Sequence, residues 1–374
     1  MIFLDNSSTT HKKPRCVISG YKKGLTSLSV NAGRGGYDLA VEAGMEVLNV
    51  RTRLADMFNT RPEDVVFTGS CTQALNLGLR GYIKPNGHIV ATVLEHNSVL
   101  RTLEYLKNKY NISYTLVKPT KHIIHAKDIE DAITPKTYLV CCIHTSNVTG
   151  ATNNIEEIGK VCKKHGCKFL VDCAQSGGHI KVDMVKCNIN MVTLAGHKGF
   201  YAPQGIGVLL KRDIDITPLI YGGTGTHSES LSQPNESPEG LESGTLSMPN
   251  ILALGKGVEY VEKHFDRLNH KMHKMTTKLI DYLKTNRNVI LYSYNTHSGI
   301  ASINIKGKDS TEVSDILNEK YHICVRSGLH CAPKLHEYYN TLTRGMVRIS
   351  VSPFNKLNEI KKCIKAIDEI SKNK

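Results

Sequence analysis

Seven short apolar runs constrain what this chain can fold into more than any other feature. They occupy residues 64–69, 88–93, 113–117, 138–143, 168–172, 190–195 and 205–210. Segments with the hydrophobic period of an α-helix precede or separate them, at residues 39–58, 74–79, 98–108 and 154–165. Strands that are apolar throughout must be covered on both faces, and repeated β-α-β units place their strands parallel. The sequence therefore predicts an α/β fold around a mostly parallel, seven-stranded sheet.

The rest of the chain predicts a second, smaller domain. With 374 residues the chain is too long for one ordinary core. A polar, Gly/Pro-rich segment at 222–250 leads into a long amphipathic helix over 250–285. Strands at 299–305, 322–325 and 346–351, with helices at 310–320 and 357–371, then form an α+β pattern. We expect a large domain over residues 14–250 and a small domain formed by residues 1–13 and 251–374.

Composition excludes several classes of protein. The chain has 40% hydrophobic and 22% charged residues, as soluble globular proteins do, and no apolar run long enough to span a bilayer. The first residues lack a secretory leader, and the 11 cysteines are scattered without a paired framework, so we expect a cytoplasmic protein with free thiols. The nearest zinc-like spacing, Cys162-x4-Cys167-x5-Cys173, runs into a predicted strand, so no metal site is expected.

The formal net charge of +14 comes from dispersed lysines. No nucleic-acid-binding motif accompanies them, so a solvated basic surface is the preferred interpretation, with an acidic protein partner as the second. We expect no nucleic-acid partner and no membrane partner.

Two residues that end successive predicted strands indicate the chemistry. Lys198 follows the strand at 190–195 and precedes a glycine-rich turn, and Asp172 ends the strand at 168–172. Ligands of an open parallel sheet bind beyond the carboxyl ends of its strands, so both side chains are expected to face one crevice. A desolvated lysine can bond to an aldehyde cofactor, and pyridoxal phosphate also needs a carboxylate at its ring nitrogen. A surface lysine and a helix cap are the ordinary interpretations of each residue alone, but the pair favours a pyridoxal phosphate site.

Three more segments reach the same rim. Thr72 ends Thr68-Gly-Ser-Cys-Thr72, between a strand and a helix, where backbone N–H groups and a hydroxyl can hold a phosphate. His96 and Asn147 each follow a strand, so His96 can stack on a planar ring and Asn147 can offer an amide. A simple helix cap for the Thr72 segment, and a core or surface position for His96, are the alternatives.

Together these segments resemble the class V aminotransferase family of fold-type I pyridoxal phosphate enzymes. The resemblance runs through nearly the whole chain, from Leu4-Asp-Asn-Ser-Ser-Thr-Thr to Arg348. It implies that Lys198 holds the cofactor, that Asp172 pairs with its ring nitrogen and that Gln175 reaches its phenolic oxygen. His96 would stack on the pyridine ring and take part in catalysis.

The same resemblance implies the phosphate ligands and a homodimer. The Cys71 backbone N–H, Thr72 and His197 would contact the phosphate. Glu242-Ser-Gly-Thr245 is similar to the family loop that gives a phosphate ligand to the neighbouring subunit, so Thr245 would act across a dimer interface. Ala195 stands where the family usually has a serine, and Cys71 replaces a commoner threonine. Tyr37, in Arg34-Gly-Gly-Tyr37, replaces a histidine often found near the substrate.

Motifs in the second domain narrow the resemblance to one group within this family. Val325-Arg326-Ser-Gly-Leu-His330-Cys331-Ala-Pro333 is similar to the Arg-x-Gly-x-His-Cys-Ala loop of group II (Suf-type) cysteine desulfurases and selenocysteine lyases. A buried inert thiol is the ordinary interpretation of a single cysteine, but a flexible loop with basic neighbours favours a thiolate at Cys331. Thr343-Arg-Gly-Met-Val-Arg348 resembles the segment whose arginine grips the substrate carboxylate. Arg348 is preferred over Arg344, and Arg326 and Asn147 are the further substrate ligands.

The resemblance implies a cysteine desulfurase that converts L-cysteine to L-alanine and leaves the sulfur as a persulfide on Cys331. An acceptor protein or a small thiol would then take the sulfur, for iron–sulfur cluster assembly, thio-cofactor synthesis or selenium recycling. A selenocysteine lyase or a class V aminotransferase on the same fold is the alternative enzyme. A basic scaffold protein that has lost catalysis is the alternative outside enzymes.

Overall fold

A seven-stranded sheet forms the centre of the protein. The computed structural model describes residues 1–32, 35–294 and 298–372. The sheet contains β2 (Val65–Thr68), β3 (His88–Thr92), β4 (Ser113–Val117), β5 (Thr137–Ile143), β6 (Lys168–Asp172), β7 (Met191–Ala195) and β8 (Gly207–Lys211). Their spatial order is β2-β8-β7-β6-β5-β3-β4. The predicted α/β fold with a mostly parallel seven-stranded sheet is confirmed.

Strand β8 is the exception to the parallel pattern. It runs antiparallel to both of its neighbours, β2 and β7, whereas β3 to β7 pair in parallel. Only residues 196–206 separate β7 from β8. That connection is too short for the crossover that a parallel return needs, so the chain turns back on itself after Lys198.

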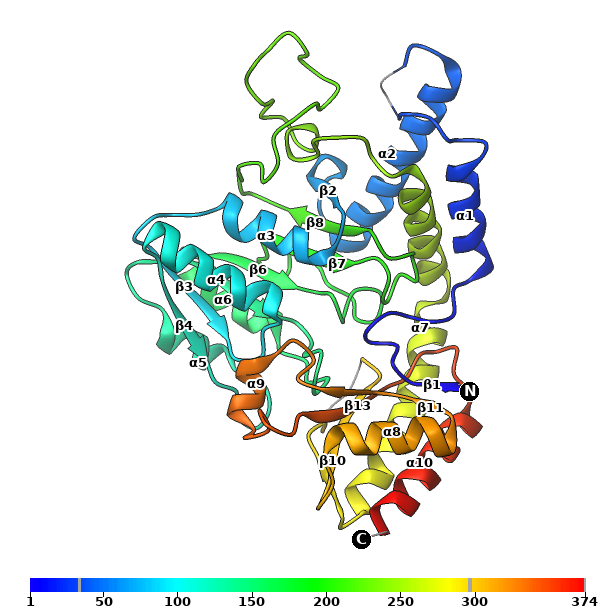
Figure 1. The fold of residues 1–374 in the computed structure, drawn as a ribbon. Helices are drawn as coiled ribbons and strands as arrows, with labels where there is room; N and C mark the ends of the chain where they lie inside the picture. Colours follow the sequence, from blue (N-terminus) through cyan, green and yellow to red (C-terminus); the bar gives the residue numbers. More distant parts are fainter. Residues whose placement is uncertain (33–34, 295–297, 373–374) are drawn as a thin grey trace.

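Helices cover both faces of this sheet, as Figure 1 shows. One face packs against α2 (Asp38–Phe58), α5 (Ala126–Ala132), α6 (Ile155–Lys164) and the first part of α7 (Met248–Thr285), and the other against α3 (Cys71–Gly81) and α4 (Asn97–Tyr110). Along β5, Val140 and Cys142 belong to the first core, whereas Leu139 and Cys141 belong to the second. Successive strand residues point to opposite faces, so both parities are apolar.

Helix α1 (Arg15–Leu25) packs along α7 outside the first helical layer. Gly20 and Gly24 lie one turn apart on α1, and a Cβ atom on either would meet the backbone of α7 at Leu252 or Pro249. The two glycines therefore allow the helices to approach closely. Two short 3₁₀ helices, at Pro62–Asp64 and Glu239–Leu241, complete this part of the chain.

A smaller sheet lies below the large one in Figure 1. Its four strands have the order β12-β13-β10-β9, all antiparallel: β9 (Val289–Leu291), β10 (Ile300–Ile305), β12 (Arg326–Gly328) and β13 (Met346–Ser350). Around it lie α8 (Ser310–Tyr321), α9 (Pro333–Tyr338) and α10 (Leu357–Lys372). Strands β9 and β12 were not predicted, because three half-buried residues give no clear pattern.

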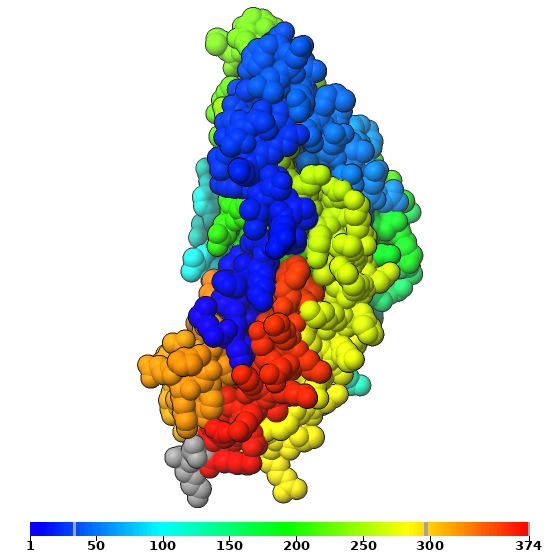
Figure 2. Space-filling model, turned by 90° about the vertical axis from the view of Figure 1, so that its right-hand side faces the viewer, coloured from blue at the N-terminus to red at the C-terminus, as the bar shows by residue number. Residues whose placement is uncertain are grey.

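The N-terminal segment belongs structurally to this smaller part. Strand β1 (Ile2–Phe3) pairs in parallel with β11 (Ile323–Cys324), and Figure 2 shows the blue N-terminal segment running down to the red C-terminal part. Leu4 joins the core formed by the second half of α7, β10, β13, α8 and α10. The domain boundaries at 13/14 and 250/251 stay a prediction, since α7 runs without interruption through residue 250.

Candidate active site

A cavity of about 220 Å³ lies at the carboxyl ends of β5, β6 and β7. It brings together residues from both parts of the molecule that are far apart in the sequence. The predicted site residues that line it are Cys71, Thr72, His96, Asn147, Asp172, Gln175, His197, Lys198, Arg326 and Arg348.

Lys198 and Asp172 are the buried ionisable pair at the centre of this cavity. Burial lowers the pKa of Lys198, and the negative charge of Asp172 opposes that shift. Burial raises the pKa of Asp172, which is 2% exposed, while the N–H of Ala174 donates to Oδ1 at 2.9 Å and stabilises the carboxylate. Among the described residues Lys198 Nζ makes no hydrogen bond and no ion pair. The amine is therefore available as a nucleophile, and its lowered pKa favours the reactive free base.

The N-terminus of α3 fits a phosphate group. Ser70 caps the helix, since its Oγ accepts from the N–H of Gln73 at 3.2 Å and its carbonyl accepts from the N–H of Ala74 at 3.0 Å. Within the described part of the chain, the N–H groups of Cys71 and Thr72 have no acceptor. Free N–H groups at the positive end of a helix dipole bind anions, so this end of the cavity suits a phosphate.

The side chains around the phosphate position have defined partners. Thr72 Oγ1 lies 2.8 Å from Ser98 Oγ, and Cys71 Sγ donates to Asp172 Oδ1 at 3.8 Å. Burial lowers the pKa of His197 to about 4, so its ring is neutral and has one N–H to give. His197 Nδ1 is buried and finds no partner among the described residues. These groups fit a phosphate, with the backbone of Cys71 rather than its thiol as the available donor.

His96 and Gln175 lie where a planar ring would be held. The Nδ1 atom of His96 accepts from the N–H of Ser98 at 3.1 Å, so the ring proton is on Nε2. Burial, followed by the positive charge of Lys198, lowers the pKa of His96 to about 4. Gln175 Nε2 donates to the carbonyl of Ser7 at 3.1 Å, which leaves its amide oxygen as the free acceptor. A neutral imidazole and a fixed amide suit an aromatic cofactor.

Two arginines form the opposite wall of the cavity. Arg348 in β13 lies directly across from Arg326 in β12 and is 1% exposed. Its Nη1 donates to the carbonyl of Asn147 at 2.9 Å, and its Nη2 donates to Asp5 Oδ1 at 2.9 Å and Ser8 Oγ at 2.8 Å. Burial lowers the pKa of Arg348, and Asp5 opposes that shift. This wall suits a small carboxylate.

Arg344 does not share this position. Its Nη2 donates to the carbonyls of Ile305 and Lys308, at 3.1 and 3.0 Å, and it does not line the cavity. The structure therefore favours Arg348 over Arg344 for the contact with the substrate.

Cys331 lies between β12 and α9, at the edge of the cavity rather than in its wall. Its neighbour His330 lines the cavity. The carbonyl of Cys331 accepts from the N–H of Asn97 at 2.7 Å, and the carbonyl of His330 accepts from Asn147 Nδ2, also at 2.7 Å. Both residues have left-handed backbone angles, with φ of +48° at His330 and +58° at Cys331. These bonds tie the loop to the first residue of α4 and to the segment that follows β5.

The other predicted residues lie outside the cavity. Thr245 is exposed and lines a separate cavity with Phe67 and Ser243. Tyr37 is 53% exposed at the start of α2, and Arg34 lies outside the described residues. Ala195 lines the cavity, as its place in the sequence predicts.

Sequence reasoning missed several residues of the site. Asp5 and Ser8 hold Arg348, and Ser7 contacts Gln175, although the segment that contains them had no assigned role. The only signal was its run of small polar residues directly after an apolar strand. His330 was noted as a neighbour of the thiol and not as a wall of the cavity.

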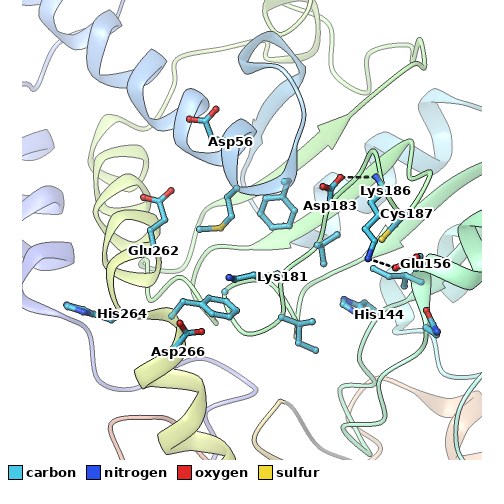
Figure 3. A pocket seen from close by; sticks show the side chains of 18 of the residues that line it. Asp56, His144, Glu156, Lys181, Asp183, Lys186, Cys187, Glu262, His264 and Asp266 are labelled. Carbon is cyan, nitrogen blue, oxygen red and sulfur yellow. Dashed lines mark hydrogen bonds and ion pairs between the residues drawn. The ribbon is translucent and has the colours of Figure 1, made fainter.

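A second, larger cavity of about 960 Å³ lies between α2, α7 and the segment 178–187, as Figure 3 shows. His144 lines it from behind the loop that carries Asn147, and its Nδ1 lies 2.9 Å from Ser176 Oγ. Carboxylates and amines alternate around it, and none of the predicted site residues lines it. Within the described residues, no group of three or more His, Cys, Asp or Glu side chains is arranged to hold a metal ion.

The fold and the 220 Å³ cavity define a pyridoxal phosphate-dependent enzyme of fold type I. The buried lysine, the carboxylate beside it, the neutral histidine and the helix N-terminus supply a partner for each part of that cofactor. No helix among the described residues is both long and apolar enough to cross a membrane.

Comparison with known proteins shows the family. The model of the class V aminotransferase family matches residues 2–363, so the chain belongs to that family. Probable cysteine desulfurases of Methanothermobacter thermautotrophicus and Pyrococcus abyssi are 30% and 31% identical; the alignments cover 99% and 100% of this chain and 94% and 95% of those proteins. The apo structure of a cysteine desulfurase from Thermococcus onnurineus superposes with a TM-score of 0.91 at 30% identity, covering 100% of this chain and 95% of that one.

Proposed function

We propose that this cavity converts L-cysteine to L-alanine, with the sulfur retained as a persulfide on Cys331. The protein is a pyridoxal phosphate-dependent cysteine desulfurase, as its full-length similarity to curated cysteine desulfurases supports. The single observation that carries the residue assignment is the Cys331 loop, which is hydrogen-bonded to Asn97 and Asn147 beside the Lys198 cavity. The reaction balances, because the substrate and the Cys331 thiol give alanine and a persulfide.

Lys198, Asp172 and Gln175 would hold the cofactor and move the protons. The cofactor supplies the electron sink that makes the substrate Cα–H acidic. Lys198 would hold the cofactor through Nζ, and its free amine, which its lowered pKa favours, would take the Cα proton of the substrate. Asp172 keeps the ring nitrogen protonated, and Gln175 offers its amide to the phenolic oxygen.

The remaining pocket residues position the cofactor and the substrate. His96 stacks on the ring, while the N–H groups of Cys71 and Thr72, with His197, hold the phosphate. Arg348, Arg326 and Asn147 bind the substrate carboxylate, and the acidic group in contact with Arg348 is Asp5. This arrangement directs the substrate side chain towards the edge of the cavity where the Cys331 loop lies.

Cys331 would act as the sulfur acceptor. Its thiolate attacks the substrate sulfur, the Cβ–S bond breaks, and the electron pair returns to the three-carbon fragment that becomes alanine. The group II (Suf-type) assignment rests on this loop, and a sulfur-acceptor protein or a small thiol removes the persulfide.

A homodimer would complete the site. Thr245 is exposed and does not line the cavity that holds Lys198, which suits a ligand for a partner subunit. Two apolar stripes lie exposed, one on α1 and one on α2. They consist of Ile18, Tyr21 and Leu25 of α1, and Val41, Met45 and Leu48 of α2. Stripes of this kind mark protein interfaces.

Two observations bear on the cellular compartment and on the pathway that receives the sulfur. All 11 cysteines are free thiols, which suits a reducing cytoplasm. Two relatives named cysteine desulfurase IscS, from Rickettsia species, are 31% identical over 85% and 77% of this chain. Iron–sulfur cluster assembly is therefore the pathway we propose first for the sulfur.

The experiment is to incubate the purified holoprotein with L-cysteine and a reductant and to measure alanine and sulfide. The Cys331→Ala variant should keep the visible absorbance of bound pyridoxal phosphate and lose desulfuration, with no persulfide found by mass spectrometry. Cys324→Ala is the matched control, since Cys324 is also half-buried and lies in β11 away from the cavity. Full turnover by Cys331→Ala, with transamination of another amino acid, would point instead to an aminotransferase.

A further inference from the structure

Asp5 occupies the position on Arg348 where a substrate carboxylate would bind. Its Oδ1 lies 2.9 Å from Arg348 Nη2 and accepts a second hydrogen bond, at 2.7 Å, from Ser8 Oγ. We propose that Asp5 is an internal competitor of the substrate: it holds Arg348 in the free protein and releases Nη2 when the substrate carboxylate arrives. The proposal rests on the proposed function, in which Arg348 binds that carboxylate.

The geometry of the guanidinium requires an exchange. A carboxylate can be bound by two parallel N–H groups either at Nε and Nη2 or at Nη1 and Nη2. Both arrangements use Nη2, and both hydrogens of Nη2 are already given, to Asp5 Oδ1 and to Ser8 Oγ. A substrate therefore cannot make the two-bond contact with Arg348 until Asp5 or Ser8 lets go.

In the free protein, not every N–H group of Arg348 has a hydrogen-bond acceptor. Its Nε is buried and has no hydrogen-bond partner among the described residues. Arg326, directly across the strand pair, has its Nη1 on Ser8 Oγ at 3.3 Å. Both guanidinium groups therefore donate to the hydroxyl of Ser8, and the carboxylate in contact with Arg348 is Asp5. An incoming carboxylate would add a second negative charge beside the two arginines.

Of the two side chains bound to Arg348 Nη2, we expect that of Asp5, rather than that of Ser8, to move away. The Asp5 side chain is 21% exposed, whereas the Arg348 side chain is 2% exposed. The backbone around Asp5 is fixed, since the Leu4 N–H donates to the carbonyl of Cys324 at 2.8 Å and the Leu4 carbonyl accepts from Ser350 at 2.6 Å. A rotation of the Asp5 side chain towards solvent therefore releases Nη2 without moving the strand.

The substrate carboxylate must therefore break the contact between Asp5 and Arg348, and the free energy of that contact weakens substrate binding. Replacing Asp5 by Asn keeps the shape and removes the charge, and charge-assisted hydrogen bonds are about twice as strong as neutral ones. For Asp5→Asn we expect the KM for L-cysteine to fall about fivefold or more, with kcat within about twofold of the wild type.

A purely structural role for Asp5 gives the opposite result. Arg348 would then lose the group that positions it, and KM would rise together with a loss of thermal stability. An unchanged or raised KM in an active Asp5→Asn variant overturns the proposal and leaves the proposed function intact. Absence of alanine production by the wild type would instead overturn the function itself. Asp131→Asn is the control, because Asp131 is an exposed carboxylate paired only with Lys127, and its KM should not change.

A measurement on the wild-type holoprotein covers the case in which Asp5→Asn does not fold. In a crystal structure of the complex with L-alanine, the distance from Asp5 Oδ1 to Arg348 Nη2 should exceed about 4 Å, the limit of an ion pair. It is 2.9 Å in the free protein. A bound L-alanine carboxylate with the Asp5 contact still in place would refute the exchange.

Discussion

Glu95 is a fully buried carboxyl group whose protonation should make the stability of the protein depend on pH. It is 0% exposed and lies next to His96 at the end of β3. Its Oε1 accepts from Thr92 Oγ1 at 2.6 Å and from the N–H of Ile143 at 2.9 Å, whereas Oε2 has no partner among the described residues. Burial, with a further contribution from the charge of Asp172, raises the pKa of Glu95 to about 8.

The direction of this pH dependence follows from the number of protons that the folded and unfolded states bind. Between pH 5 and 7.5 the folded Glu95 keeps its proton, whereas in the unfolded chain it ionises, with an ordinary pKa near 4.5. The unfolded state then binds fewer protons, so the free energy of unfolding falls as pH rises. Each pH unit in that window costs about 1.4 kcal/mol, or roughly 3 kcal/mol over the whole window. Above pH 8 the folded group also ionises and the loss levels off.

The Glu95→Gln variant isolates this effect. Gln cannot ionise, so the difference in unfolding free energy, variant minus wild type, should rise by about 3 kcal/mol from pH 5 to pH 7.5. Any constant cost of the buried amide cancels in that difference. Urea unfolding followed by circular dichroism measures it, since the chain has no tryptophan. Glu319→Gln, at an exposed position of α8, is the control. Parallel pH curves for Glu95→Gln and the wild type would refute the reasoning.

Three further predictions concern two buried positions and the arginine in the wall of the cavity. Glu242→Ala should lower the free energy of unfolding by about 3 to 5 kcal/mol in urea, because it leaves the buried guanidinium of Arg51 without its partner. Gly257→Ala should cost about 2 kcal/mol or more by the same measurement, since its Cβ would collide with the carbonyl oxygen of Phe200. Arg348→Lys should raise the KM for L-cysteine about tenfold in steady-state assays and leave the visible absorbance of bound cofactor unchanged, because an ammonium cannot make the two-bond contact. Retained stability in the first two variants, or an unchanged KM in the third, would contradict these assignments.

The large sheet could be predicted because its strands are apolar on both faces. Core positions such as Val140 and Leu139 alternate between two helical layers, so the whole run reads as hydrophobic. The small strand β12 could not, since its residues Arg326–Gly328 are half-buried and polar. Its place in the sheet is fixed by pairing with β13, which is a tertiary effect.

The site residues differ in the same way: some could be predicted from a local sequence pattern, and others depend on tertiary contacts. Lys198 and Asp172 could be predicted because each ends a strand, and parallel strands meet at one edge. The contact between Asp5 and Arg348 joins positions 343 residues apart, and no local pattern in either segment signals it. The position of His330 in the cavity wall likewise depends on how the small sheet packs against the large one.

The left-handed backbone at His330 and Cys331 places conformational strain in the loop that carries Cys331. Two successive left-handed residues other than glycine cost about 1 to 3 kcal/mol each. The two hydrogen bonds from Asn97 and Asn147 that hold the loop contribute about 0.5 to 1.5 kcal/mol each, which is about half of that strain. Both bonds cross between the two parts of the molecule, and a small separation of those parts breaks them together. The loop would then relax outwards and carry its thiol from the substrate towards an acceptor in solution.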